Sequence, residues 1–511
     1  MSPRRVSTPL AVVLLVYAIC AVVAPVSADE TVRVTTDRLD LVISLDGANP
    51  VVWRACYPSC ARADAGAGTS VRFVDENEPP MIRVIGPNFD SPVDLQRLRY
   101  VADVREDDRT RIATFHAELP VGGIRFVKAF EVSRDGYQVV MTVRLEGSNA
   151  AAFMAGRRLE LELHAGRGLL PPPAAGFAAM LERMNRVIVA NGAVRTEDDS
   201  PASSTLRSPD WMGFRSRFWT VLVRPDGAGL LEAQPGASGA LRLASEPGQL
   251  SWRYTFYSGP LEHSALTDAD RELGRLLFSG LWFWLRPLSF GLLFLLRRLT
   301  DVIGHPGGAI IALAVSVKIL LLPLVAVAER LQEQVNATQA RLQPGIDAIK
   351  AAYRGEERTR RTIALYREQG VHPLYTVKSL VGFAIQLPVF IAVFDMLAED
   401  VDLQRVSFLW IRDLSQPDAL ARLPACVPFF GCTLNLLPFL MSGVSLLTVL
   451  RFRSSVLTPT LVRRQRRNLM TITAAFFLLF YTFPASMVLY WTSTNFFQLL
   501  SQELGQLWRR A

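Results

Sequence analysis

The sequence predicts a multi-domain membrane protein, with an exported β-sandwich before an α-helical core of five transmembrane helices and an N-terminal signal or anchor helix. Three observations predict this fold class. Alternating apolar and polar residues recur between Thr31 and Tyr257, and long apolar runs fill residues 276–505. The charges that flank these runs are distributed asymmetrically. The mean hydropathy of +0.22 is high for a purely soluble protein and agrees with this division.

Residues 1–29 have the pattern of a targeting segment. Arg4 and Arg5 precede an apolar core from Leu10 to Ala24, and the short segment V-S-A follows. This order is typical of a secretory signal peptide, and the apolar core is almost long enough for a signal-anchor helix. Both interpretations send the next domain across the membrane.

We expect residues 30–262 to form a single β-sandwich. Two alternating runs are joined by Asp135-Gly136, a strong signal for a β-hairpin. Cys56 and Cys60 lie in the same domain, where export permits oxidation. The two cysteines can therefore form a local disulfide or remain as free buried thiols, and the sequence leaves both alternatives open.

Residues 263–306 connect the sandwich to the membrane. After a short helical lead-in, an amphipathic stretch contains Trp282 and Trp284 and ends at Arg297-Arg298. Aromatic residues with basic ends suit a helix that lies in the membrane interface. A buried soluble helix is the alternative.

The first transmembrane helix is expected over residues 307–328, and its unusual feature is Lys318. At about 1.5 Å per residue, the twenty residues from Ala309 to Ala328 span the ~30 Å hydrocarbon layer with this lysine near the centre. A central lysine costs about 2.5–3.5 kcal/mol, whereas the surrounding Leu, Ile and Val residues return about 4–7 kcal/mol, so the helix inserts. We expect the ammonium to face water or a polar partner inside the bundle. Snorkelling to the interface or pairing with a buried carboxylate is the alternative.

Residues 373–510 are expected to hold the remaining transmembrane helices. These are at about 375–397, 433–450, 469–484 and 485–504. The segment 329–372 holds eight Lys or Arg against six acids, and 451–467 holds six Arg and no acid. In contrast, 399–424 holds five acids and three Arg. Because positively charged segments stay in the cytoplasm, the first two segments are expected inside and the third outside, with the sandwich.

The cytoplasmic segment 329–372 predicts a helical hairpin. Apolar residues recur at three-, four- and seven-residue steps as far as Tyr353, Gly355 interrupts the pattern, and a second helix is expected over 356–369. The hairpin can serve as a docking surface for a partner or be solvated without a partner, and the sequence leaves both alternatives open.

The sequence contains no recognisable motif for chemistry. The five histidines are scattered, and there is no Walker A loop, H-E-x-x-H, G-x-S-x-G, dinucleotide fingerprint or zinc-ligand spacing. We therefore expect no catalytic residue, metal or cofactor, and not an enzyme. The formal net charge is +8, and the Arg clusters flank apolar runs, which favours contact with the lipid bilayer and no direct nucleic-acid function.

Four motifs occur in a characteristic order: S-V-K-I-L-L-L-P-L, a charged hairpin ending in V-H-P-L, then I-Q-L-P-V-F, and finally F-P-A-S-M-V-L-Y-W-T-S-T-N. In order and spacing they resemble the YidC-type membrane protein insertases, in the Gram-negative form with a large periplasmic domain. The resemblance implies an insertase and chaperone of the bacterial inner membrane that inserts and folds nascent membrane proteins. It implies a hydrophilic groove open to cytoplasm and lipid, with the Sec translocon and the ribosome as candidate partners.

The resemblance also implies a substrate groove, in which Lys318 matches the family's usual arginine. Leu387 and Phe390 match substrate-contacting positions, and Trp491 matches a tyrosine on the last span. Polar residues scattered through the spans are further candidates for a wet concavity around the lysine; they include Ser316, Gln386, Thr494 and Gln498.

Two rival functions remain. A solute transporter would use Lys318 as a substrate-binding charge, but transporters tend to carry internal repeats, and none is visible between the halves of 307–505. A structural anchor that presents the sandwich to a ligand leaves this lysine unexplained.

Overall fold

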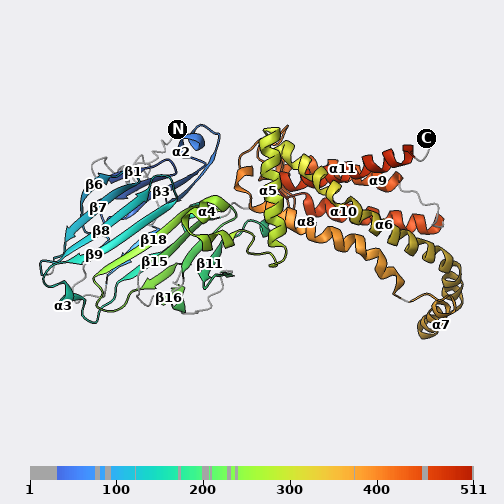
Figure 1. Ribbon diagram of the computed structural model, residues 1–511, viewed down its shortest axis with the longest axis horizontal. Coiled ribbons are helices and arrows are strands. Elements are labelled where there is room, and N and C mark those ends of the chain that lie inside the picture. The colour runs from blue at the N-terminus through green and yellow to red at the C-terminus, as the bar shows by residue number, and fades with distance from the viewer. Residues whose placement is uncertain are drawn as a thin grey trace, which may run out of the picture.

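The structure is a computed structural model that describes residues 31–74, 81–86, 94–120, 122–170, 174–197, 206–207, 210–226, 232–235, 240–372, 374–451 and 459–508. The predicted signal or anchor helix, 1–29, lies outside the described residues. A β-rich part and a helical part follow one another along the long axis of the molecule (Figure 1).

The β-rich part is built around a nine-stranded sheet in which all neighbouring strands are antiparallel. In spatial order its strands are β12 (Ala193–Glu197), β11 (Asn185–Ala190), β14 (Trp211–Arg215), β15 (Trp219–Asp226), β18 (Ser251–Pro260), β9 (Gln138–Glu146), β8 (Arg125–Ser133), β7 (Thr110–Glu118) and β6 (Val101–Glu106). The hairpin predicted around Asp135-Gly136 is confirmed, because β8 pairs with β9 and Val132 lies opposite Val139.

Two smaller sheets complete the β-rich part. One consists of β1 (Thr31–Thr35), β2 (Leu39–Ser44), β3 (Pro50–Tyr57) and β4 (Thr69–Val74), and the other of β13 (Leu206–Arg207), β16 (Glu232–Pro235), β17 (Leu241–Ala244), β10 (Glu160–Leu163) and β5 (Ile82–Ile85). The short helices are α2 (Cys60–Asp64), α3 (Ala150–Met154), η2 (Arg167–Leu169) and η3 (Gly176–Met180). The buried Trp53 of β3 donates its indole N–H to Ser258 Oγ of β18 at 2.8 Å, so the four-stranded sheet packs on the nine-stranded one.

Among the Asp, Glu, Lys and Arg side chains of the described β-rich part, that of Lys128 is the most deeply buried. Lys128 of β8 is 1% exposed, and its Nζ donates to Gly47 O at 2.6 Å and to Asn49 Oδ1 at 3.2 Å. Burial lowers the pKa of this ammonium to about 7, because a charge is costly to remove from water.

The connection to the helical part contains α4 (His263–Ala269), η5 (Arg271–Leu276) and α5 (Arg286–Ile303). The prediction that Trp282 and Trp284 belong to the amphipathic helix is wrong, because α5 begins only after them. Pro287 explains this start, since proline is tolerated in the first turn of a helix and not in its interior. The two indole rings stack at 6.1 Å and are more than half exposed.

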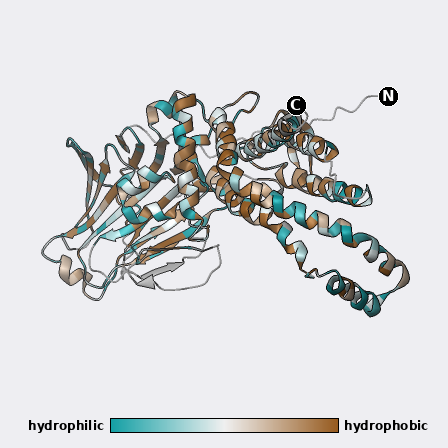
Figure 2. Cartoon of the chain, turned by 45° about the vertical axis from the view of Figure 1, so that its right-hand side comes forward, coloured by the Kyte–Doolittle hydropathy of each residue, from teal (hydrophilic) through white to brown (hydrophobic). Residues whose placement is uncertain are grey.

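The helical part contains α6 (Pro306–Ala352), α7 (Gly355–Glu368), η6 (Tyr375–Leu380), α8 (Val381–Glu399), η7 (Val401–Leu403), α9 (Leu437–Arg451), α10 (Pro459–Phe480) and α11 (Ala485–Trp508), and the hairpin β19 (Ala421–Val427) and β20 (Gly431–Leu434). The first predicted span and the first arm of the predicted hairpin are one continuous helix, α6. The second arm, α7, carries polar side chains at the far end of the molecule (Figure 2).

Among the described helices, α6 and α8 are long and apolar enough to cross a bilayer, and α9 is a shorter apolar helix. The hydropathy of α10 is reduced by four arginines near its start, and that of α11 by its Ser, Thr, Asn and Gln residues. A β-rich region followed by a helical core is thus confirmed, and five transmembrane helices stay a prediction.

The β-rich part is bonded to the C-terminal end of α8. Arg215 forms an ion pair with Glu399 at 2.6 Å, and Arg217 Nε donates to Ala398 O at 2.7 Å. Tyr57 donates its hydroxyl to Asp402, just beyond the helix, at 2.8 Å. The end of this helix is therefore held by charged and polar contacts from β3, β14 and the turn that follows β14.

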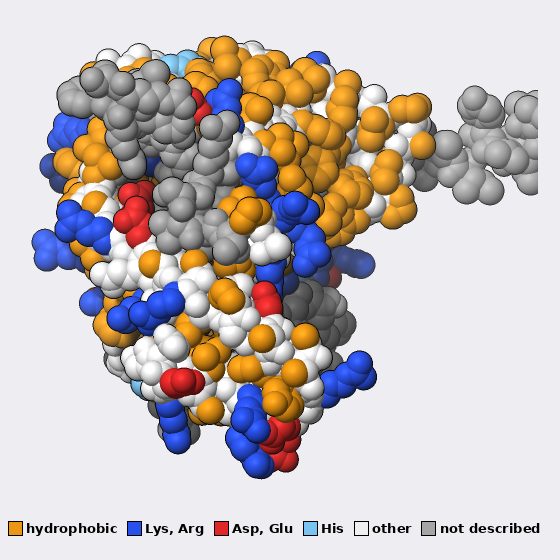
Figure 3. Space-filling model, turned by 90° about the vertical axis from the view of Figure 1, so that its right-hand side faces the viewer, with side chains coloured by type: hydrophobic (Ala, Val, Ile, Leu, Met, Phe, Trp, Pro, Cys, Tyr) orange, Lys and Arg blue, Asp and Glu red, His pale blue; other side chains and the backbone are white. Residues whose placement is uncertain are grey.

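The end of the molecule opposite the β-rich part differs in character. Figure 3 shows Lys and Arg side chains spread over this face, beside a large hydrophobic area. The arginines Arg463, Arg464, Arg466 and Arg467 lie here, on the first turns of α10. A polar, basic end next to an apolar zone is the arrangement expected where a membrane protein enters the cytoplasm.

Candidate functional site

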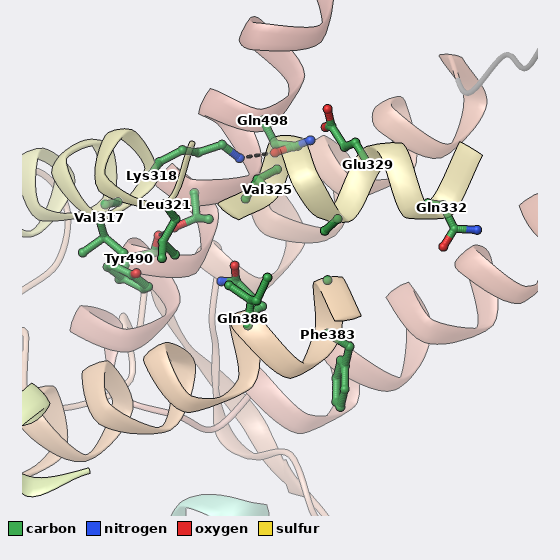
Figure 4. Close-up of a pocket in the computed structure, with 15 residues that line it drawn as sticks. Val317, Lys318, Leu321, Val325, Glu329, Gln332, Phe383, Gln386, Tyr490 and Gln498 are labelled. Carbon is green, nitrogen blue, oxygen red and sulfur yellow. Dashed lines mark hydrogen bonds between the residues drawn. The ribbon is translucent and has the colours of Figure 1, made fainter. Parts of the chain in front are cut away.

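A groove of about 470 Å³ lies between α6, α8 and α11 (Figure 4). Helix α11 contacts both other helices, and α6 also packs on α8. The lining residues are Ala314, Val317, Lys318, Leu321, Val325, Ala328, Glu329 and Gln332 of α6, Gly382, Phe383, Ile385 and Gln386 of α8, and Tyr490, Thr494 and Gln498 of α11.

The lining residues of α6 share one helical face. They recur at steps of three, four and seven residues, the spacing that brings side chains onto one side of an α-helix. Ala314 and Val317 are buried against neighbouring helices, whereas Lys318 is only half-buried. The chain therefore places Lys318 at the edge between packed core and groove.

The ammonium of Lys318 has a neutral partner. Its Nζ donates a hydrogen bond to Gln498 Oε1 of α11. In the part of the chain that the structure describes, no carboxylate forms an ion pair with this lysine. Pairing of Lys318 with a buried carboxylate is thus not observed among the described residues. The positive charge of the groove is not neutralised by a direct contact.

The groove is more polar toward the end of α6 that leads into the hairpin. Glu329 and Gln332 lie at that end, and Gln386 points into the space from α8 (Figure 4). The other end is closed by Val317 and by Tyr490, which is 1% exposed. The cavity thus has a polar mouth, a cation along its wall and an apolar end.

Four of the residues expected around the groove line it, namely Lys318, Gln386, Thr494 and Gln498. Ser316 lies outside the lining, and its hydroxyl donates to Ala312 O of its own helix at 2.9 Å. Leu387, which is 37% exposed, also lies outside the lining. A helix turns about 100° per residue, so Leu387 lies on a different side of α8 from its groove-facing neighbour.

Phe390 and Trp491 belong to a neighbouring aromatic cluster instead of the groove lining. Their ring centroids are 5.0 Å apart, and Trp491 stacks on Phe476 of α10 at 5.4 Å. Phe394 and Phe480 extend the cluster. The groove thus has an apolar aromatic surface beside it, formed by α8, α10 and α11.

Three polar groove residues were not singled out from the sequence: Glu329, Gln332 and Tyr490. A signal existed for Glu329, since it follows Lys318 by eleven residues, or about three helical turns, on the same face. The expected boundary at residue 328 separates Glu329 from Lys318, whereas α6 is one continuous helix that carries both residues.

Two disulfides lie away from the groove, toward the β-rich end. Cys56 and Cys60 are bonded, and so are Cys426 and Cys432 of the β19–β20 hairpin. The second disulfide was not foreseen from the sequence. Its hairpin contacts the β-rich part, because the rings of Phe429 and Phe177 are 5.1 Å apart.

Among the described residues, no group of three His, Cys, Asp or Glu side chains is placed to hold a metal ion. The polar groups of the groove are amides, hydroxyls, one carboxylate and one ammonium. Such groups suit reversible binding of polar and charged segments by hydrogen bonds and electrostatic attraction.

Comparison with known proteins gives a consistent result. Residues 298–507 match the family described as 60Kd inner membrane protein. The membrane protein insertase YidC of Syntrophobacter fumaroxidans is 27% identical over 420 residues, which cover 78% of this chain and 71% of the relative. The insertase YidC of Bordetella avium is 27% identical over 503 residues, 94% of this chain and 83% of the relative. The insertase YidC of Beijerinckia indica is 26% identical over 367 residues, which cover 65% of this chain and 59% of the relative.

A solved structure of an active YidC insertase is 16% identical, with a TM-score of 0.37, and the match covers 96% of this chain and 97% of that one. The helical core that carries the groove lies within the region that matches this family. Over most of its length, the chain is similar to proteins named membrane protein insertase YidC.

Proposed function

We propose that this protein inserts nascent membrane proteins into the bacterial inner membrane, and that their polar segments pass through the groove between α6, α8 and α11. The observation that carries the proposal is the half-buried Lys318, which has a neutral partner in a cavity with a polar mouth. The relatives are named insertases, so a solute transporter is not the interpretation we favour.

The physical problem of insertion is the cost of moving polar groups through hydrocarbon. Each charge in a bilayer centre is costly, and a hydrated groove shortens the apolar path and raises the local dielectric constant. An ammonium along that path attracts acidic residues of the incoming segment. Burial of the apolar segment in lipid then supplies the driving force without nucleotide hydrolysis.

The aromatic cluster beside the groove suits the lateral step. Leu387 is exposed on α8, and Phe390 and Trp491 present apolar rings next to the cavity. In this proposal the apolar segment leaves past these three side chains, while its polar tail remains near Lys318. Insertion and folding of the substrate thus use adjacent surfaces.

For the topology, we propose five transmembrane helices, a periplasmic β-sandwich and a cytoplasmic hairpin formed by the end of α6 and by α7. Two observations support it. Disulfides persist in oxidising compartments, and both disulfides lie toward the β-rich end. The arginines of α10 lie at the opposite end, as expected for a cytoplasmic face. The hairpin is then placed to receive substrates, with the ribosome and the Sec translocon as candidate partners.

The test is insertion of a small single-span membrane protein in cells depleted of their own insertase. We expect Lys318→Arg to restore insertion, because it keeps the charge, and Lys318→Leu to impair insertion of substrates with acidic tails. Equal insertion by both variants would contradict the role of the groove charge. In addition, a cysteine at position 318 should react with a membrane-impermeant thiol reagent applied from the cytoplasmic side.

A further inference from the structure

Lys318 and Gln498 are 180 residues apart in the chain, and their contact links the two groove-forming helices α6 and α11. The proposed function gives the lysine a role but leaves the glutamine without one. Thr494 lies one turn before Gln498, and its hydroxyl is occupied by Tyr490 O at 3.0 Å. Among the described groove residues, Gln498 thus supplies the direct hydrogen-bond acceptor for the ammonium.

The amide of Gln498 affects the lysine differently from an apolar or an acidic side chain at the same position. A leucine would leave the half-buried ammonium without an acceptor, and a glutamate would neutralise it in a lasting ion pair. Glutamine satisfies one N–H of the lysine and leaves the positive charge in place. Because a neutral acceptor binds an ammonium more weakly than a carboxylate does, an incoming carboxylate can replace it.

The position of the amide also suits the reception of a carboxylate. In the view of Figure 4, Gln498 lies between Lys318 and Glu329, with its carbonyl oxygen directed toward the lysine. A carboxylate has two acceptor oxygens, whereas a glutamine amide offers N–H donors as well as an acceptor. Once displaced, the amide can therefore donate to the second oxygen of the carboxylate that replaced it.

We propose that Gln498 is the resting partner of Lys318, that an Asp or Glu side chain of the entering segment displaces it, and that this exchange sets the preference of the groove for acidic segments. Gln498 is thus a specificity-determining residue that holds the ammonium in position while keeping it available. This inference rests on the proposed function and adds the partner exchange at the same site.

The decisive variant is Gln498→Glu in the full chain, because it is nearly isosteric and puts a permanent carboxylate beside the lysine. The probe is a single-span test protein whose translocated tail carries three Asp residues, compared with the same tail carrying three Asn residues. We expect the ratio of Asp-tail to Asn-tail insertion to fall about tenfold, since an internal ion pair competes with the substrate. Insertion of the Asn-tail protein reports whether the variant folds.

The matched control is Asn495→Asp, the same amide-to-carboxylate change three residues earlier on α11. Asn495 Nδ2 donates to Ser445 Oγ of α9 at 2.9 Å and is outside the groove lining. We expect this variant to keep the wild-type Asp-to-Asn ratio. A fall as large as that of Gln498→Glu would overturn the inference, because any added negative charge on α11 would then suffice.

A second variant keeps the proposal testable if the first is poorly folded. The exchange Lys318→Gln with Gln498→Lys moves the cation to α11 and retains an amide as its partner. We expect it to recover most of the preference for acidic tails, and failure to recover it counts against the inference.

Lys318→Leu separates the two proposals. If this variant lowers the Asp-to-Asn ratio and Gln498→Glu does not, the partner exchange is wrong and the insertase function stands. If neither variant changes the ratio, the groove charge has no role and the proposed mechanism fails as well.

Discussion

The ion pair between Arg215 and Glu399 is the contact whose removal the structure lets us quantify best. It joins β14 to the last residue of α8 with an N–O distance of 2.6 Å, and the two side chains are 9% and 14% exposed. Glu399 also accepts the backbone N–H of Phe278 at 3.0 Å. The perturbation is Glu399→Gln, which removes the charge and keeps the shape and one acceptor oxygen.

The expected cost follows from the arginine that is left behind. Breaking a buried pair by removing one partner costs about 3–5 kcal/mol, because the other charge remains in a poorly solvated site. Arg215 keeps two further acceptors, Leu276 O and Ser279 Oγ, both at 2.9 Å. We therefore expect a decrease in the free energy of unfolding near the lower limit, about 3 kcal/mol.

The assay is thermal or denaturant unfolding of the purified full chain in detergent, with limited proteolysis to detect loosening at the junction. An exposed pair in the same molecule provides the control. Arg451 and Glu503 lie 3.1 Å apart with side chains 55% and 40% exposed, so Glu503→Gln should cost less than about 1 kcal/mol.

A double-mutant cycle decides whether the two groups act as a pair. We expect Arg215→Met combined with Glu399→Leu to be more stable than the sum of the single changes predicts, with a coupling energy of about 2 kcal/mol. Additive effects, or a cost of Glu399→Gln no larger than that of the exposed control, would refute the argument that this contact holds the end of α8.

Three further predictions concern separate parts of the molecule. Glu329→Gln should increase insertion of strongly acidic tails about threefold in the depletion assay, because it removes a like charge of the groove mouth; an unchanged rate would contradict this. Lys128 has its pKa lowered from 10.5 to about 7, so the folded state binds fewer protons than the unfolded state between these values. The cost of burying the charged form is therefore absent above pH 10.5 and grows as the pH falls toward 7, so Lys128→Met should flatten the rise in Tm between about pH 7 and 10. Replacement of Cys426 and Cys432 by serine should speed proteolysis of the β19–β20 hairpin and lower the free energy of unfolding by about 2 kcal/mol, and equal proteolysis rates would contradict a stabilising role.

The sequence was sufficient for features that depend on local pattern. Asp135-Gly136 predicts a hairpin because this dipeptide favours the tight turns that join antiparallel strands. The structure forms the hairpin there, between β8 and β9. The isolated Lys318 is visible because charges are rare in apolar runs, and the groove is found around it. A charge in an otherwise apolar helix needs a polar environment wherever the helix packs.

Features that depend on how helices face one another were harder to predict. Periodicity defines the faces of α6 and α11 but not which face meets which, so the pairing of Lys318 with Gln498 was not foreseen. Phe390 and Trp491 were expected in the groove because they match positions of the family that the chain resembles, and their rings pack in the adjacent aromatic cluster. The helix boundary before Arg286 was missed because the aromatic residues continue the apolar pattern on both sides of it.

The continuity of α6 has a mechanical consequence. Its 47 residues extend about 70 Å, so the groove lysine and the far end of the hairpin arm belong to one rod. Pro323 and Pro344 lie between them, and each removes one backbone hydrogen bond, which makes them the natural bending points of that rod. A force on the distal arm therefore tilts the wall that carries the ammonium, so that a partner docked on this arm changes the width of the groove without touching it.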